Sequence, residues 1–371
     1  MLTCASQPRF ISSATGNNGE GMKSFWEKLP RPFFALAPLA DVTDPAFRAL
    51  VAKYGKRDVI WTEFISADGL YHLLEKVRER PRDAAARRVK PSAGEAVTLS
   101  ARRLPRKLTF SENPLMRDLQ FTKAERPIVM QAFSGKPKMI AYAARLAEEL
   151  GFDGFDINMG CPDKAIEKQG AGAGLMRNPK LALELVVAAK AATTLPISVK
   201  TRVGYHYEIL DEWVPLLLST KPAALTIHLR TRREMSAAPA DWGLMKRAVA
   251  LRDKCGSNTL LIGNGDVKDL GDARAKAKES GADGVMMGRA IFGNPWLFTG
   301  RTNISTKEKL EVLVELAYAF EKLSPPKSFV ILKKHIKAFV MGFEGAVELR
   351  AKMMKAENAK ELAESILGSN G

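Results

Sequence analysis

The stretch that decides the fold reads Gly154-Phe155-Asp156-Ile157-Asn158-Met159-Gly160-Cys161-Pro162. An apolar, β-like run ends here in a polar turn, and a glycine-rich segment follows at 169–174. In parallel α/β enzymes, the turn after a strand presents side chains to the substrate. The alternative is a structural cysteine, because free cysteines are among the most buried residues. The remainder of the chain decides between these two interpretations of Cys161.

Strand and helix patterns alternate on both sides of this stretch. Short apolar, β-branched runs predict eight strands, at 34–40, 59–66, 127–133, 154–159, 197–203, 224–229, 260–265 and 284–288. Helical patterns lie between them, as at 138–150, 180–192, 242–254 and 269–280. Eight such units over about 260 residues predict a closed (β/α)8 TIM barrel spanning 33–300. A doubly wound open sheet is the competitor, but the first predicted strand–helix turn, 37–41, lacks the glycines of that fold.

Both ends of the chain differ from the barrel region. Residues 305–368 carry no strand pattern and are rich in Lys, Glu, Ala and Leu. We predict a small helical domain at 301–371, in which a helix starts near Ser305 and Pro325-Pro326 separates two helices. The first 21 residues are polar and lack the apolar core of a secretory signal. We therefore expect residues 1–32 to form a disordered N-terminal extension.

Composition narrows the functional class. No run of about 18 apolar residues appears, so no membrane span is expected. The three cysteines, Cys4, Cys161 and Cys255, are far apart, which argues against a disulfide framework or a zinc site and favours a cytoplasmic protein without metal. The net charge of +16 and the isoelectric point near 9.7 favour a polyanionic partner, nucleic acid first and anionic membrane second. A generally basic surface without a partner is the alternative.

Much of this charge lies in one segment. Residues 76–107 contain eleven Lys and Arg against three acidic residues, a net charge of +8 and half of the total. Proline, alanine and serine fill much of the remainder. We predict a loosely ordered basic insertion at about 76–126 that contacts phosphates. The alternative is a solvated loop with no partner.

Polar or small residues end the predicted strands, where a TIM barrel has its active site. Gly265 and Gly288 would let backbone N–H groups approach a phosphate, and Arg289 could pair with it. Lys200 could stabilise negative charge on a reduced flavin, and Gln131 could address a ring edge. Together they predict a flavin mononucleotide (FMN) site. The glycines of 170–174 do not match a dinucleotide motif and are interpreted as a loop near the site.

Taken in order, these motifs resemble the tRNA-dihydrouridine synthase family over about residues 33–365. The matching segments are Ala37-Pro38-Leu39-Ala40 with Thr43-Asp44 and Phe47-Arg48, Thr62-Glu63, Asn158 to Pro162, Lys200-Thr201-Arg202, His228 with Arg230-Thr231-Arg232, Ala240-Asp241-Trp242, Asn264-Gly265-Asp266, Gly284 to Arg289, and Gly293-Asn294-Pro295-Trp296. Each segment is weak evidence alone, whereas the ordered combination is specific.

The resemblance implies an FMN-binding barrel, a helical tRNA-binding domain, and NADPH-driven reduction of the C5–C6 double bond of selected tRNA uridines by a monomer. In that family scheme, Cys161 would donate the proton to C5. The flavin would be held by Pro38, Leu39, Ala40, Gln131, Lys200, His228, Asn264, Gly265, Asp266, Gly288 and Arg289. Contacts to the substrate would come from Asn158, Arg202, Arg230, Arg232, Lys333 and Lys334.

Two departures from the family pattern affect the substrate contacts. Leu229-Arg230 stands where the family usually has Gly-Arg, and Ser236-Ala237-Ala238 stands where a tyrosine and a glycine are usual. One alternative is an FMN barrel acting on a free pyrimidine, like dihydroorotate dehydrogenases, which the charge and the helical domain argue against. The other is a non-catalytic RNA-binding protein, which the intact Cys161 and Lys200 argue against.

Overall fold

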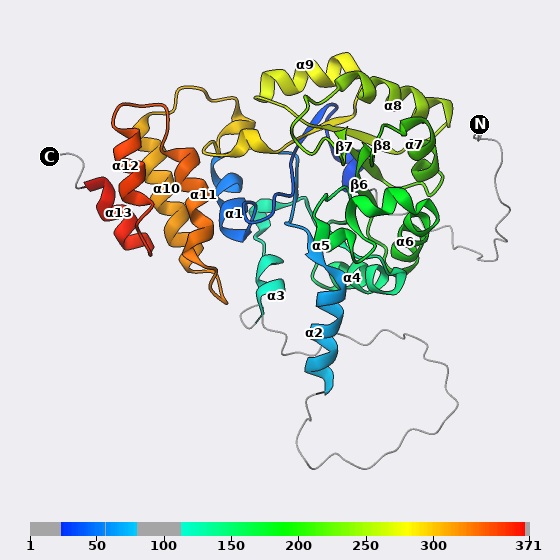
Figure 1. The fold of residues 1–371 in the computed structure, drawn as a ribbon, viewed down its shortest axis with the longest axis horizontal. Coiled ribbons are helices and arrows are strands. Elements are labelled where there is room, and N and C mark those ends of the chain that lie inside the picture. Colours follow the sequence, from blue (N-terminus) through cyan, green and yellow to red (C-terminus); the bar gives the residue numbers. More distant parts are fainter. Residues whose placement is uncertain (1–23, 56, 80–112, 368–371) are drawn as a thin grey trace, which may run out of the picture.

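The computed structural model describes residues 24–55, 57–79 and 113–367. Its strands form one parallel sheet in the order β2-β1-β9-β8-β7-β6-β5-β4-β3, and a pairing of β2 with β4 closes it into a barrel. The predicted TIM barrel is therefore confirmed (Figure 1). The strands are β1 Phe33–Leu36, β2 Val59–Trp61, β3 Ile65–Ser66, β4 Ile128–Phe133, β5 Gly154–Met159, β6 Ile197–Gly204, β7 Ala224–Thr231, β8 Leu260–Asn264 and β9 Gly284–Met287.

The predicted second strand, 59–66, is broken into β2 and β3. At the break, side-chain oxygens accept hydrogen bonds from backbone N–H groups. The Gln131 N–H donates to the Thr62 hydroxyl (3.1 Å), and the Val42 N–H donates to the Glu63 carboxylate (3.1 Å). β2 and β3 both pair with β4, so the pair counts as one strand of an eight-stranded barrel. The strand pattern missed the break because Thr62 and Phe64 favour a strand, although Glu63 between them does not.

Helices cover the outside of the barrel, and their starts follow local capping rules. Asn178, Asp241 and Asp269 each accept a hydrogen bond from a backbone N–H in the first turn of α6, α8 and α9. The outer helices are α1 Pro45–Tyr54, α2 Ala67–Glu79, α4 Pro137–Glu149, α6 Pro179–Ala192, α7 Leu210–Leu218, α8 Trp242–Lys254 and α9 Leu270–Ser280. The four helices predicted between strands are found within one residue of their expected bounds.

Side chains from one face of the strands fill the barrel interior. Trp26 packs against this interior cluster near the start of β1. Trp26 lies in a short 3-10 turn, η1 Phe25–Lys28, and its ring packs against Phe33 (5.8 Å between centroids) and Trp61 (5.9 Å). The prediction of a disordered extension over 1–32 is thus wrong for residues 24–32, because burial of an indole orders them. Residues 1–23 lie outside the described residues.

The predicted basic insertion, 76–126, overlaps ordered structure at both ends. Residues 76–79 are the last turn of α2, and 113–126 contain α3 Pro114–Asp118 and the 3-10 turn η3 Lys123–Glu125. Met116, Leu119 and Glu125 are buried against the barrel. Residues 80–112, with most of the charge, lie outside the described residues, so the proposed phosphate contacts remain a prediction.

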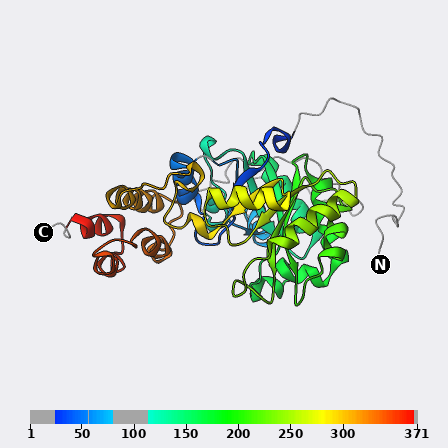
Figure 2. The ribbon, with the colours of Figure 1, turned by 90° about the horizontal axis from the view of Figure 1, so that it is seen from above.

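Four helices after the barrel form a bundle at one edge of it, as Figures 1 and 2 show. They are α10 Thr306–Glu321, α11 Phe329–Phe339, α12 Ala346–Met353 and α13 Ala359–Leu367. Ser305 caps α10 through a bond from the Glu308 N–H (3.1 Å), as predicted. One continuous apolar core joins the bundle to the barrel. Across the described ranges, every helix is too short or too polar to cross a bilayer.

Candidate functional site

The register of the barrel brings the polar strand ends into one layer. Asn158 pairs with Lys200, and His228 pairs with both Arg202 and Asn264. Lys200 Nζ donates to Asn264 Oδ1 (3.2 Å), and Asn264 Nδ2 donates to the Met286 carbonyl (2.8 Å). These contacts tie β6, β8 and β9 together at the carboxyl end of the barrel. Asn158, Lys200, His228 and Asn264, which the sequence analysis assigned to the site, are therefore neighbours in space.

A buried carboxylate lies beneath this layer. Asp156 accepts hydrogen bonds from Ser198 Oγ and from Gln131 Nε2 (2.7 Å), and Gln131 Oε1 in turn accepts from Asn158 Nδ2 (2.9 Å). Burial raises the pKa of Asp156 to about 6 against these bonds. Asp156 was not predicted as a site residue, although it lies on the same strand face as Asn158, two residues later. Asp156 fixes which end of the Gln131 amide faces Asn158.

Asn158 also shapes the turn that carries Cys161. Its Oδ1 accepts from the N–H groups of Gly160 (3.1 Å) and Cys161 (2.9 Å). On the far side of the turn, the Cys161 carbonyl accepts from Ala173 N–H (2.9 Å), and Gly172 lies so close that a Cβ there would stand 2.7 Å from that carbonyl. The thiol is thus held at the strand end by bonds on both sides.

Burial favours the protonated form of this thiol. It raises the pKa of Cys161 above its ordinary value, and the Asp163 backbone and the cations Arg202 and Lys200 oppose the rise only partly. Burial and then Arg202 lower the pKa of Lys200 to about 8, so most Lys200 remains cationic at neutral pH. Burial and the cations Lys200 and Arg202 hold the pKa of His228 far below its usual range. The site therefore combines a neutral thiol, a cation and a neutral imidazole.

A corner of excess positive charge lies where β8 and β9 end. Arg230 and Arg289 both donate to the Asp266 carboxylate, so two guanidinium groups share one anion. Gly265 has φ +132°, a conformation that side chains rarely adopt, and its carbonyl accepts from Trp242 Nε1 (2.9 Å). The Arg230 bonds lower the pKa of Asp266 to about 2, so it stays ionised. A net positive charge remains for an anion.

The predicted substrate arginines mostly bind the protein itself. Arg202 donates to the carbonyls of Gly160 (2.7 Å), Thr231 and Met235 (both 3.1 Å). Arg232 makes a two-bond ion pair with Glu167 (2.7 and 2.9 Å) and also donates to the Pro162 carbonyl (3.2 Å). These bonds hold the Cys161 loop against its neighbours.

The remaining predicted residues lie in the turn after β1 and on helix α11. Pro38, Leu39 and Ala40 follow β1, and a Cβ on Gly288 would stand 3.6 Å from Leu39 Cδ2, so this turn borders the end of β9. Lys333 and Lys334 lie on α11 in the helical bundle, and Lys334 pairs with Asp41 in the loop after β1 (3.1 Å). The structure thus does not join these two lysines to the barrel layer.

Comparison with known proteins shows the family of this chain. A family model described as "Dihydrouridine synthase (Dus)" matches residues 35–91 and 100–367. The chain belongs to the dihydrouridine synthase family. Similar proteins include the "Probable tRNA-dihydrouridine synthase" of Staphylococcus aureus strain COL, 36% identical over 91% of this chain and 93% of that protein. Another is the "Probable tRNA-dihydrouridine synthase 2" of Bacillus subtilis strain 168, 37% identical over 92% and 94%.

Among solved structures, a variant of NCR from Zymomonas mobilis is similar over 74% of this chain and 89% of that chain. Its sequence identity is 16% and its TM-score is 0.40, too distant to bear on the site.

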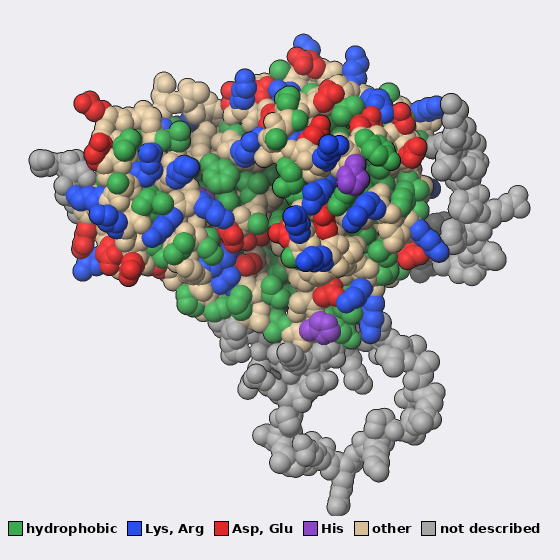
Figure 3. Space-filling view, viewed as in Figure 1, with side chains coloured by type: hydrophobic (Ala, Val, Ile, Leu, Met, Phe, Trp, Pro, Cys, Tyr) green, Lys and Arg blue, Asp and Glu red, His purple; other side chains and the backbone are tan. Residues whose placement is uncertain are grey.

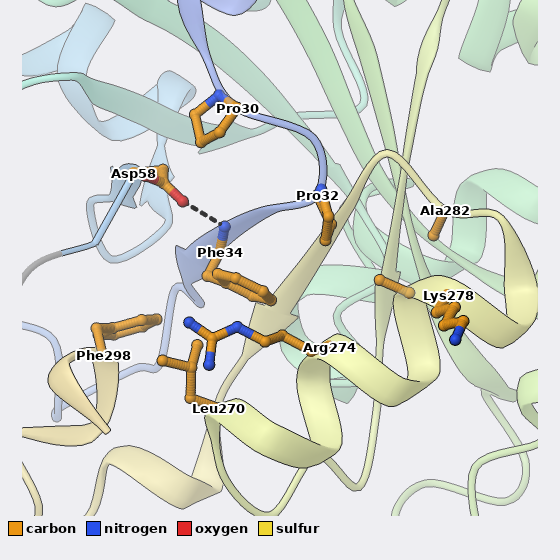
Figure 4. Close-up of a pocket in the computed structure, with 10 residues that line it drawn as sticks. Pro30, Pro32, Phe34, Asp58, Leu270, Arg274, Lys278, Ala282 and Phe298 are labelled. Atoms are coloured by element: carbon orange, nitrogen blue, oxygen red, sulfur yellow. Dashed lines mark hydrogen bonds between the residues drawn. The ribbon is translucent and has the colours of Figure 1, made fainter. Parts of the chain in front are cut away.

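A groove of about 660 Å³ elsewhere on the barrel is separate from this site (Figure 4). It lies between β1 and α9, where Arg274 reaches under the ring of Phe34 (5.8 Å to its centroid) and Phe298 lies opposite. Asp58 accepts from the Phe34 N–H (2.8 Å) at one side. Two 3-10 turns, Arg289–Ile291 and Leu297–Thr299, follow β9, and Phe298 of the second turn lines the groove. None of the predicted site residues lines it.

The raised pKa of the Cys161 thiol predicts slow alkylation in this dihydrouridine synthase family member. Only the thiolate reacts with iodoacetamide, so the rate is expected to keep rising with pH beyond about 8.5, where the cysteine of an unstructured peptide is half ionised. Peptide mass spectrometry of Cys161 between pH 7 and 10 measures this, with an unstructured cysteine-containing peptide as the reference. A rate that levels off below pH 8 would mean a stabilised thiolate and would contradict a proton-donating role.

Proposed function

We propose that this protein reduces uridine bases of tRNA to dihydrouridine, with FMN bound at the mouth of the barrel, NADPH as the reductant and Cys161 as the proton donor. The observation that carries the proposal is the Asn158-capped turn, which holds a protonated thiol at the strand ends beside Lys200 and Arg202. Membership of the dihydrouridine synthase family supports the same reaction.

The residues at the mouth fit FMN by charge and by donor set. Within the described residues, no hydrogen bond uses the backbone N–H of Asp266 or Arg289, and Arg230 with Arg289 outweighs the single Asp266 carboxylate. Free N–H groups beside excess positive charge suit a phosphate. Gly265, Gly288 and the turn of Pro38, Leu39 and Ala40 would border it, and Gln131, Lys200, His228 and Asn264 would face the ring.

Reduction of the uracil C5–C6 bond needs a hydride equivalent at C6 and a proton at C5. FMN, reduced by NADPH, supplies the hydride chemistry when bound. Cys161 Sγ holds the proton for C5, and the resulting thiolate takes a proton from water afterwards. Lys200, largely cationic near neutral pH, stabilises negative charge that develops nearby. Asn158 Nδ2 and Arg202 each keep an N–H beyond their described bonds that can address the uracil edge.

Positive charge on the outer surface supports the proposal that the substrate uridine is part of a tRNA. Lys and Arg side chains lie on both sides of the hollow between the helical bundle and the barrel in Figure 3. In the bundle, Lys334, Lys337 and Arg350 line a cleft of about 440 Å³ together with Phe292 and Met341. Flipping a base out of its stack costs a few kcal/mol, which contacts to phosphates can offset. Lys333 and Lys334 are proposed here as phosphate contacts, not as contacts to the base.

An anaerobic assay with unmodified tRNA, FMN and NADPH tests the proposal. Dihydrouridine at a defined position, mapped by mass spectrometry, is the expected product, and free uracil and free orotate are the matched small substrates. Turnover of a free pyrimidine without any on tRNA would instead favour a dihydroorotate dehydrogenase-like activity. A protein that takes up no flavin would overturn both enzymatic proposals and favour a non-catalytic RNA-binding role.

A further inference from the structure

A lysine of the helical domain is buried in the barrel. Lys327 lies between α10 and α11, directly after Pro325-Pro326, and its side chain is 3% exposed. Its ammonium group stands 3.3 Å from Asp118, 3.5 Å from Glu63 and 3.9 Å from Asp44. Burying a lysine is costly unless it is paired, so these three carboxylates hold the charge in place. No residue of the mechanism described above belongs to this cluster.

Two of these carboxylates shape the loop between β1 and α1. Asp44 caps α1 by accepting from the Phe47 N–H (3.0 Å), and Glu63 Oε1 accepts from the Val42 N–H (3.1 Å). The same loop contains Pro38, Leu39 and Ala40, where FMN is proposed to bind. Lys327 therefore contacts the two acids that fix the far half of the flavin loop.

Helix α11 holds this loop at two further points. Lys334 pairs with Asp41, which has φ +56°, an unfavourable backbone conformation that needs support from its surroundings. The His335 ring packs on Phe47 with 4.5 Å between centroids. Burial lowers the pKa of His335 to about 4, and the nearby Val42 backbone partly opposes that shift. The helical domain thus contacts Asp41, Val42 and Asp44 through residues within nine positions of one another.

Local charges make Lys327 hard to replace. Arg117 is committed to Asp118 (2.9 and 3.1 Å) and to the carbonyls of Pro325 and Pro326 (3.0 and 3.3 Å). Arg48 is committed to Glu125 and to the Thr43 carbonyl (3.0 and 2.8 Å). Burial already raises the pKa of Glu63 to about 7, and loss of Lys327 would raise it further. A protonated Glu63 would accept from the Val42 N–H less strongly, because a hydrogen bond to an ionised acceptor is the stronger one.

We propose that Lys327 is a positioning residue for the cofactor: by pairing with Asp44 and Glu63, it holds the β1–α1 loop in the form that binds FMN. The inference rests on the proposed FMN site. On this proposal the helical domain has two roles. It binds RNA, and it supports the β1–α1 loop of the FMN site through Lys327.

The test compares FMN affinity in full-length Lys327→Met, Lys327→Arg and Lys360→Met, measured by quenching of flavin fluorescence. Lys360 is an exposed lysine of α13 whose one ion pair within the described part of the chain is with Glu364 at 3.8 Å, so its variant is the matched control. We expect Lys327→Met to weaken FMN binding about tenfold or more, as for loss of a supporting partner behind a site. Lys327→Arg should recover most of that affinity, and Lys360→Met should bind like the wild type.

Hydrogen exchange of the flavin-free protein gives an independent readout. Residues 37–44 should exchange faster in Lys327→Met, while residues 197–204 of β6 keep the wild-type rate. Unchanged FMN affinity and unchanged exchange would overturn the inference, as would an equal loss in Lys327→Arg, which would point to packing in place of charge. If the wild type binds no FMN, the proposed function fails, whereas the exchange experiment still tests the link to the loop.

Should Lys327→Met fail to fold, Lys334→Met removes a surface contact to the same loop without burying anything new. It is expected to weaken FMN binding about two- to threefold, since a partly exposed ion pair contributes less than about 1 kcal/mol. Wild-type affinity and wild-type exchange of residues 37–44 in that variant would count against the helical domain as a support for the loop.

Discussion

Replacing Cys161 by alanine is expected to lower the rate of dihydrouridine formation by about 10²- to 10⁴-fold, the usual contribution of a general acid. The side chain is removed from a turn whose bonds are made by backbone groups, so the turn should keep its shape. FMN binding and tRNA binding should therefore remain near wild type. Single-turnover kinetics on unmodified tRNA, with FMN reduced beforehand, measure the proton-transfer step directly.

The matched control is Cys255→Ala, at the C-terminal cap of α8. It removes a thiol of similar size outside the strand-end layer, and its rate should equal that of the wild type. A Cys161→Ala variant that retains more than about a tenth of the wild-type rate would assign the proton to another donor, because general acids contribute at least about 10²-fold. Equal losses of rate and of FMN affinity would instead indicate a collapsed loop.

The largest expected effect on stability comes from Arg48→Met. Arg48 on α1 is fully buried, pairs with buried Glu125 at 3.0 Å, and donates to the carbonyls of Thr43 (2.8 Å) and Gln120 (2.5 Å). The substitution keeps the volume but leaves a buried carboxylate without its cation. Breaking such a pair typically costs about 3–5 kcal/mol of the free energy of unfolding. Denaturant unfolding followed by circular dichroism measures the loss.

Arg301→Met is the control for that experiment. Arg301 pairs with Glu308 at 3.0 Å, but its side chain is 50% exposed, and surface pairs contribute about 0–1 kcal/mol. A loss below about 1 kcal/mol for Arg48→Met would show that Glu125 is solvated or neutralised once its partner is gone. That result would contradict a structural role for the pair at the base of the flavin loop.

Much of the fold could be predicted from short-range pattern. The runs around Asn158, Lys200 and His228 alternate apolar and polar residues with the period of a strand, and capping residues such as Ser305 mark helix starts. Those signals act within a few residues, so they survive without knowledge of the partners. The broken second strand and the ordered turn of Trp26 could not be predicted, because both depend on side chains from distant segments.

The candidate site also has a part that could be predicted from sequence and a part that could not. Local sequence pattern was sufficient to predict that Cys161, Lys200, His228 and Asn264 stand at strand ends, and closure of a parallel barrel brings all strand ends to one face. The pattern gave no sign that Arg232 binds Glu167, that Asp156 orients Gln131, or that Lys327 reaches Glu63 across 264 positions of chain, because these contacts arise from the packing of remote segments. The physical reason is range: periodicity and capping are set by neighbours along the chain, whereas buried ion pairs form only where packing brings remote charges together and removes water from both.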